Sequence, residues 1–193
     1  SSQSIKSNAH ALARYASLVQ EANMVPIVEP EVLMDGSHDI DKCYKVTTNV
    51  LNECYNELAS HKVNLRGTVL KPNMIVPGTK CSKKASAEEI AKKTLDCLKK
   101  NVPNEVPGIA FLSGGQSEIE ASENLNEINK LNDTNFLITF SYGRGLQASA
   151  LKAFGRDMND KKKIQIVFAH RAKMNGLSSK GEWSKELEKE AIA

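Results

Sequence analysis

Four apolar runs of strand length alternate with helical patterns, and this alternation constrains the fold more than any other feature of the chain. The runs cover residues 24–28, 67–74, 108–112 and 136–140. Each run is mostly apolar, as expected of a parallel strand buried on both faces, and each is followed by a helical pattern. Strands and helices in strict alternation predict an α/β fold with a parallel sheet and right-handed crossovers.

The sequence indicates the buried faces of some predicted helices and the first residues of others. A pattern over about residues 4–22 repeats Ile5, Ala9, Leu12, Ala16 and Val19 on one face. The next pattern has a predicted buried stripe of Ile40, Cys43, Val46, Val50, Cys54 and Leu58. Ser86 and Ser117 each precede a glutamate by three residues, which is the spacing of a capping box. Two more helices are expected, over about residues 146–154 and through residues 164–171.

All four runs end in polar or glycine residues, as strands do at the active-site face of a (βα)8 TIM barrel. A complete barrel needs roughly 250 residues, whereas this chain has 193 residues and four strands of the repeating type. We therefore predict the second half of a TIM barrel, about four βα units plus C-terminal helices, over residues 1–177. Residues 178–193 are polar with weak periodicity and are predicted to be a frayed or rebuilt extension.

Lys71 lies near the C-terminal end of the second run, where a charged side chain is unusual. Burying an ammonium is costly, and the usual escape is loss of the proton, which leaves a nucleophilic amine. Taken alone, Lys71 fits a strand-end lysine that reaches solvent better than it fits a nucleophile. The chemistry at the other three strand ends favours a Schiff-base enzyme.

Glu29 and Glu31 follow the first run and are separated by Pro30. Two residues apart on a strand, they are expected to point to the same side, the interior mouth of the barrel. Two neighbouring carboxylates raise the pKa of one of them, which allows a general acid near neutral pH. The alternative is a solvated acidic start of a loop.

Two glycine turns end the last two runs. Ser113, Gly114 and Gly115 precede a capped helix. Residues 141–145 form a similar glycine-containing turn before a helix and also contain Arg144. Glycines let backbone N–H groups approach an anion, a helix N-terminus adds favourable partial charge, and a guanidinium binds phosphate well. Barrel phosphate sites often lie after the last two strands, so we predict phosphate binding over ordinary strand–helix turns.

Composition argues against several other functions. The net charge is +3, and the lysines are scattered without the interleaved aromatic residues that stack bases, so no nucleic-acid partner is expected. The four cysteines lack metal-site spacing, and Cys43, Cys54 and Cys97, which fall within helical patterns, are expected to be core thiols of a reducing compartment. The four histidines are dispersed, so no metal site is expected. Neither a signal peptide nor a transmembrane stretch is apparent, and we expect no membrane partner and a cytoplasmic protein.

Five segments together resemble class I fructose-1,6-bisphosphate aldolase. They are residues 25–33, 70–74, 111–115, 140–144 and 146–151. The resemblance covers about residues 1–183 and matches the second half of that family's barrel only. It implies a metal-independent lyase of glycolysis and gluconeogenesis that needs no cofactor and acts on a phosphorylated sugar. It also implies two kinds of partner: the N-terminal half of the same barrel, and further copies of the enzyme in a homotetramer.

The resemblance also assigns roles to individual residues. Lys71 matches the Schiff-base lysine, Glu29 the acid/base glutamate of carbinolamine dehydration and Glu31 its neighbour. The pocket for the phosphate on the first carbon is matched by Ser113, Gly114, Ser141, Gly143 and Arg144.

Two departures from the family keep other functions open. The family's first-strand aspartate, fourth-strand lysine and second phosphate site would lie upstream of Ser1, and its C-terminal tyrosine has no match after Tyr142. These departures put turnover by this chain alone in question. The alternatives are a non-catalytic phosphate-binding half-barrel or assembly module, and another Schiff-base lyase such as a transaldolase-like enzyme.

Overall fold

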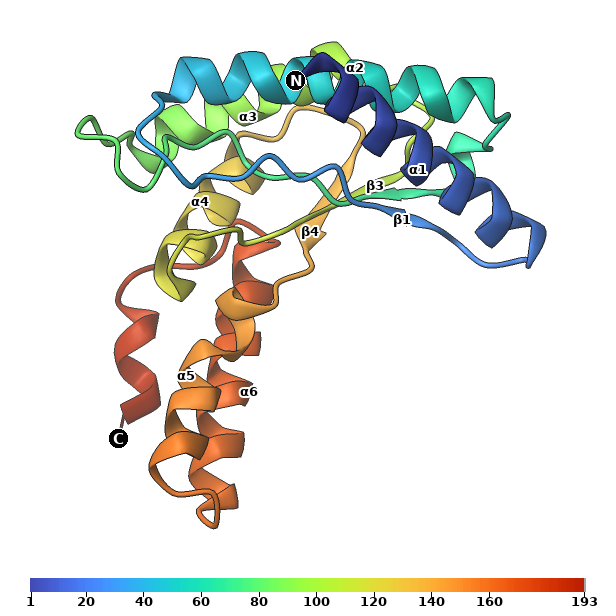
Figure 1. The fold of residues 1–193 in the computed structure, drawn as a ribbon. Helices are drawn as coiled ribbons and strands as arrows, with labels where there is room; N and C mark the ends of the chain where they lie inside the picture. Colours follow the sequence, from blue (N-terminus) through green and yellow to red (C-terminus); the bar gives the residue numbers. More distant parts are fainter. Residues whose placement is uncertain (193) are drawn as a thin grey trace.

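The computed structural model describes residues 1–192, with side chains described through residue 189. Four parallel strands form one sheet in the order β1-β2-β3-β4 (Figure 1). The strands are β1 Ile27–Val28, β2 Val69–Leu70, β3 Gly108–Phe111 and β4 Leu137–Phe140. The predicted parallel α/β arrangement is confirmed, and all four strand ends lie along one edge of the sheet.

Helices occupy the predicted positions between and after the strands. They are α1 Ser2–Glu21, α2 Ile40–Ser60, α3 Ala87–Asn101, α4 Glu118–Leu131, α5 Arg144–Arg156 and α6 Lys161–Ser178. Two short 3₁₀ helices, η1 Leu65–Gly67 and η2 Leu187–Ile192, complete the described chain. The Ser117 hydroxyl and the Glu120 carboxylate form the reciprocal capping box that the sequence predicted, and Ser86 accepts from the N–H of Glu89.

The first two strands are much shorter than the apolar runs that predicted them. β1 ends at Val28 and β2 ends at Leu70, each two residues before a proline. Proline has no N–H and cannot donate to a ladder, so regular strand structure begins only after Pro26 in β1 and ends before Pro72 in β2. The expectation that Glu29 and Glu31 lie on a strand is therefore wrong, and both belong to the loop after β1.

The main core lies between the sheet and helices α2, α3 and α4. Phe111 of β3 and Leu125 and Ile128 of α4 are fully buried there. A second cluster packs Ala9, Ala13 and Ala16 of α1 against the C-terminal half of α2. Small residues let the two helix backbones approach closely. Cys43, Cys54 and Cys97 are buried and unpaired, as predicted, and Cys81 is too.

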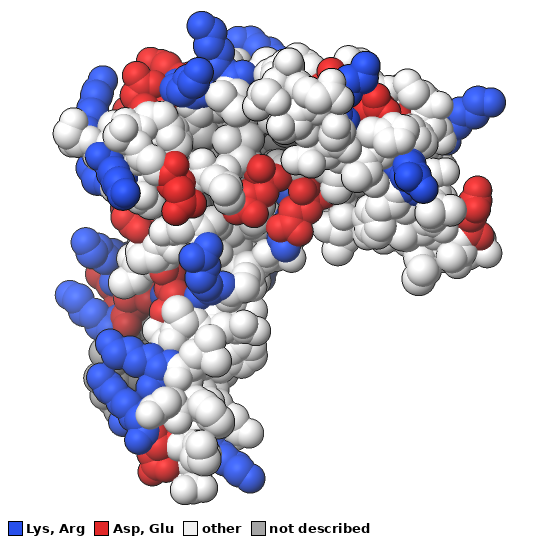
Figure 2. Space-filling view, viewed as in Figure 1, with Lys and Arg blue, Asp and Glu red and all other residues white. Residues whose placement is uncertain are grey.

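Helices α5 and α6 extend away from the sheet as an arm, so the molecule has an L shape with an open inner corner (Figures 1 and 2). Beyond the arm, the part of the predicted C-terminal extension whose side chains are described packs back through the buried Trp183 and through Glu188. The division at residue 178 remains a prediction. Among the described residues, no helix is both long and apolar enough to cross a membrane.

We expect the 193-residue chain, expressed on its own, to self-associate. Both outer strands are edges of an open parallel sheet, and Leu137 of β4 and Ile27 of β1 are 78% and 46% exposed. Unpaired edges with exposed apolar side chains recruit other chains. Sedimentation velocity over a range of concentrations measures this directly. A compact 21.2 kDa monomer at every concentration would contradict the expectation.

Candidate active site

Lys71 and Glu29 form an ion pair at the ends of two neighbouring strands. The Lys71 Nζ lies 3.2 Å from Oε1 of Glu29. The main-chain N–H of Lys71 donates to the Val28 carbonyl at 2.7 Å, so the parallel ladder continues past the strand ends and sets the two side chains beside each other. The Lys71 side chain is 20% exposed and that of Glu29 is 42% exposed. The lysine is thus half-buried and paired, where the sequence alone predicted only an apolar setting.

Glu31 faces the same groove as Glu29 but, among the described side chains, forms no ion pair with Lys71. The groove has a volume of about 860 Å³ and runs between the loop after β1 and the N-terminal half of α1. Val46 and Val50 of α2 also line it. They were expected in the buried stripe of α2 but are half-buried, and Thr47 and Leu51 take the core positions instead.

Asn73 fixes the segment after Lys71 and was not singled out from the sequence. Its side chain is buried, its Oδ1 accepts from the N–H of Val32 at 3.0 Å, and its Nδ2 donates to Thr47 Oγ1 at 3.1 Å. The loop that carries Glu29 and Glu31 is therefore tied to the segment that carries Lys71. An asparagine inside an apolar run is the signal that could have identified it, because a buried amide needs partners.

The Ser113 turn lies directly beside the Lys71 segment. The N–H of Leu112 donates to the Pro72 carbonyl at 3.1 Å, and Ser113 is buried. Gly114 has φ +57°, a conformation that side chains rarely adopt. The N–H of Gly115 lies 2.9 Å from the sulfur of Met34, which closes over the turn. No local pattern around Met34 predicts that it would lie there.

The turn around Arg144 lies against the Ser113 turn. Ser141 donates its N–H to the Phe111 carbonyl at 2.9 Å, and Gly145 donates its N–H to the Ser113 hydroxyl at 3.3 Å. Gly143 caps α5 without a side-chain hydrogen bond, and Arg144 is exposed at the first helical position. A helix N-terminus without a side-chain cap, beside a guanidinium, is an arrangement that binds anions. The structure thus brings the five predicted phosphate ligands together at two adjacent turns.

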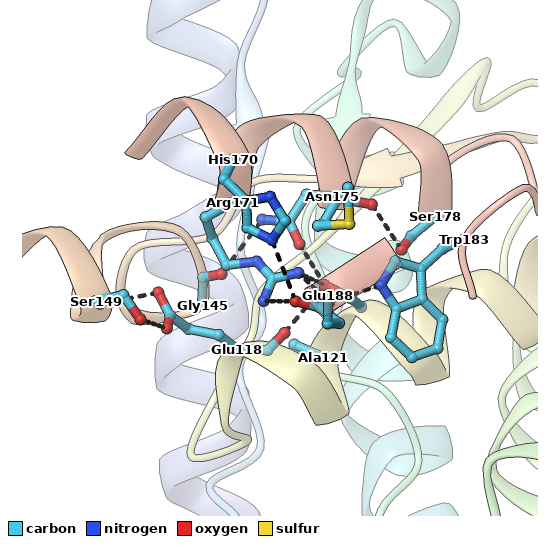
Figure 3. A network of polar contacts seen from close by, with 12 residues as sticks. Glu118, Ala121, Gly145, Ser149, His170, Arg171, Asn175, Ser178, Trp183 and Glu188 are labelled. Carbon is cyan, nitrogen blue, oxygen red and sulfur yellow. Dashed lines mark hydrogen bonds and ion pairs between the residues drawn. The ribbon is translucent and has the colours of Figure 1, made fainter. Parts of the chain in front are cut away.

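A chain of buried polar contacts supports the Arg144 turn from behind (Figure 3). Asn175 of α6 donates its Nδ2 to the Gly145 carbonyl at 3.2 Å and accepts from the Ser122 hydroxyl at 2.7 Å. Arg171 donates to the same hydroxyl at 3.2 Å, and its guanidinium forms a bidentate pair with Glu188. Glu118 of α4 accepts from the N–H and the hydroxyl of Ser149 on α5. These contacts hold α4, α5, α6 and the C-terminal stretch in one arrangement.

Glu188 accepts the last hydrogen bonds in this series of polar contacts. Burial opposes its ionisation, but Arg171, the indole N–H of Trp183 and His170 outweigh burial, so the pKa of Glu188 is held below its ordinary value. Trp183 lies after the end of α6. It is buried, and its Nε1 donates to Glu188 at 2.7 Å.

Two lines of comparison connect this chain with known proteins. A family model described as fructose-bisphosphate aldolase class-I matches residues 1–193. Fructose-bisphosphate aldolase B of Sparus aurata is 54% identical over 181 residues, which are 93% of this chain and 50% of the relative. A cytosolic fructose-bisphosphate aldolase of Arabidopsis thaliana is 52% identical over 178 residues, which are 92% of this chain and 45% of the relative.

A solved structure also matches. It is the aldolase of Plasmodium falciparum in complex with TRAP and a small-molecule inhibitor, with a TM-score of 0.92 and 43% identity over 95% of this chain and 53% of that chain. This likeness and the parallel sheet fit a fold of the TIM-barrel family. The chain spans about half the length of the relatives that it matches.

We expect Glu188→Gln to destabilise the protein in a pH-dependent way. Breaking a buried pair costs roughly 3–5 kcal/mol. We expect the low end, about 3 kcal/mol, because the Glu188 side chain retains 12% exposure. Because its pKa is lowered on folding, Glu188 stabilises the native state fully above the ordinary glutamate value of about 4.3. That contribution is lost as the pH falls through the folded-state pKa, so variant and wild type converge in acid. Urea unfolding of both proteins across this range measures the difference.

The exposed Glu186 is the matched control, and Glu186→Gln should change stability little at any pH. A difference between Glu188→Gln and wild type that stays constant down to strongly acidic pH would show that the carboxylate charge is not what stabilises this region.

Proposed function

The chain belongs to the class I fructose-bisphosphate aldolase family, and on that premise we propose that it supplies the second half of a TIM barrel that cleaves fructose 1,6-bisphosphate. The products are dihydroxyacetone phosphate and glyceraldehyde 3-phosphate. The observation that carries the proposal is the Lys71–Glu29 pair at 3.2 Å, beside two glycine turns on the next two strands. Family membership argues against the transaldolase-like alternative.

In the proposed mechanism the neutral amine of Lys71 attacks the ketone carbon of the substrate. Glu29 takes up the proton that the amine must lose and returns a proton to the carbinolamine hydroxyl, which leaves as water. The resulting iminium draws electrons from the bond between the third and fourth carbons. As that bond breaks, the hydroxyl on the fourth carbon gives its proton to a carboxylate of the site, and the aldehyde product leaves. The carboxylate then gives a proton to the enamine, and water hydrolyses the resulting iminium to free Lys71 again. Glu31 provides a second carboxylate in the same groove.

The phosphate on the first carbon would bind at Ser113, Gly114, Ser141, Gly143 and Arg144. Support comes from the adjacency of the two turns, through the Gly145–Ser113 and Ser141–Phe111 hydrogen bonds, and from the exposed guanidinium at the start of α5. A phosphate there and an amine at the end of β2 would hold the substrate along the strand ends. Such two-point binding keeps the ketone close to the nucleophile.

The remaining proposals concern what completes the site. We propose that the four other βα units come from an N-terminal half of the same protein, that the complete enzyme is a homotetramer, and that it is cytoplasmic. An upstream extension of the reading frame that encodes four βα units would support the first proposal. Because the chain spans about half of each relative, the second candidate is a phosphate-binding half-barrel without turnover.

We expect borohydride to trap dihydroxyacetone phosphate on Lys71 in the complete protein. Reduction converts the iminium to a stable amine, and peptide mapping locates the adduct. Lys71→Met should abolish trapping, whereas Lys84→Met, which removes an exposed lysine whose Nζ donates to the Thr79 carbonyl, should leave it intact. An adduct on another lysine would refute the mechanism, and substrate binding without any adduct would favour the half-barrel without turnover.

We expect Arg144→Ala to weaken recognition of the phosphate on the first carbon. Loss of a charged hydrogen bond costs about 1.5–3 kcal/mol, on the order of 10- to 100-fold in affinity. The ratio of kcat/KM for fructose 1,6-bisphosphate over free fructose should fall by that factor. The ratio over fructose 1-phosphate should change little, because both sugars carry this phosphate.

Arg156→Ala is the control for this experiment, since it removes an arginine from the opposite end of the same helix. If neither ratio changes in Arg144→Ala, or if Arg156→Ala has the same effect, Arg144 does not bind the phosphate.

A further inference from the structure

Three metal-ligating side chains meet on the outside of the α1–α2 helix pair. His10 lies in the middle of α1, Glu57 lies in the last turn of α2, and His61 is the C-cap of α2. The Nδ1 of His10 is 3.0 Å from Oε2 of Glu57, and the Nδ1 of His61 is 3.8 Å from the same oxygen. The centroids of the two imidazole rings are 4.9 Å apart, in an edge-on arrangement. The histidines are dispersed in the sequence, and the fold brings two of them together.

The geometry of this cluster suits a tetrahedral ion. One ligand atom from each of the three residues lies within 4.8 Å of the other two. Zinc binds nitrogen and oxygen at about 2.0–2.2 Å, so two of its ligands are about 3.3 Å apart. The His10 nitrogen and the Glu57 oxygen are already close to this spacing at 3.0 Å, and a ring nitrogen of His61 lies within 4.8 Å of both ligand atoms. Two histidines with one carboxylate, and water at the open position, form a known zinc ligand set.

The surroundings orient these ligands. Glu57 and His61 are four residues apart on one helix face, and their side chains are 16% and 22% exposed. The Nδ1 of His61 lies 2.9 Å from the Glu57 carbonyl, a contact that fixes the ring and, when Nδ1 carries the proton, leaves Nε2 to bind a metal. The last turn of α2 also presents the negative end of a helix dipole. His10 is 51% exposed and leaves the cluster open to solvent on one side.

Two positive charges lie near the cluster and are expected to weaken its affinity for a metal ion. Lys6 and Arg14 lie one turn before and one turn after His10 on α1, and both are exposed. Exposed charges at this spacing are screened by water and salt, so they weaken the attraction for a cation without cancelling direct coordination.

We propose that His10, Glu57 and His61 bind a divalent transition-metal ion, Zn²⁺, that links α1 to α2. The site is separate from the strand-end residues: its ligands come from two helices, and none of them lines the groove that holds Glu29 and Glu31. Zinc satisfies both imidazoles and the carboxylate at once, whereas without it two rings compete for one carboxylate oxygen. Its role is structural, since it joins the first helix of the chain to the next.

Calorimetric titration of the protein with Zn²⁺ near neutral pH tests this proposal. We expect one bound equivalent and a rise in the midpoint of thermal unfolding that a chelator reverses. His10→Asn, Glu57→Gln and His61→Asn should each weaken zinc binding at least about tenfold, because loss of even an outer-shell partner costs roughly 10- to 100-fold. Glu53→Gln, one turn earlier on α2, is the matched control and should bind zinc as the wild type does.

Two observations keep the test decisive. His10 is exposed, so His10→Asn should leave the circular dichroism spectrum unchanged even if changes at His61 disturb the end of α2. Replacing Zn²⁺ by Co²⁺ distinguishes binding at this site from binding at the four buried cysteines, because thiolate ligands add a sulfur-to-metal charge-transfer absorption band. Any one of three results would overturn the proposal. They are no binding of zinc, zinc binding that His10→Asn and Glu57→Gln leave unchanged, and a thiolate absorption band with Co²⁺.

Discussion

Three backbone hydrogen bonds just beyond the strands hold the candidate site together. Lys71 donates to the Val28 carbonyl, Leu112 to that of Pro72 and Ser141 to that of Phe111, at 2.7, 3.1 and 2.9 Å. Each bond ties the residue that directly follows one strand to the end of the neighbouring strand or to the segment just after it. The amine, the carboxylates and the two glycine turns therefore reach one edge because the parallel ladder continues where regular strand structure has ended.

The sequence predicted the elements well because local rules govern them. Apolar periodicity located the helices, and the serine at position 117 with its glutamate located the start of α4. The strand ends were also informative, since a lysine or a glycine pair after an apolar run is a local signal. Strand length was overestimated because regular strand structure begins only after Pro26 in β1 and ends before Pro72 in β2, whereas the apolar pattern extends past both prolines.

What the sequence could not predict depends on residues far apart in the chain. Asn73 reaches Val32 and Thr47, and Met34 reaches Gly115, and both residues lie in loops outside the helices and strands. Asn175 lies on the last long helix, yet it supports a turn that precedes α5. Pairings of this kind follow from the packing of whole elements, which periodicity does not describe. The roles of the site residues remain proposals for the same reason, because position alone does not show chemistry.

The order of the strands in the sheet is the order of the strands in the chain. Each strand therefore pairs with the one that was synthesised just before it, across a loop closed by a single helix. The entropy lost in closing each loop is small and is recovered before the next loop must close. A sheet of this kind can grow during translation from β1 towards β4, with each new βα unit docking on an edge that already exists.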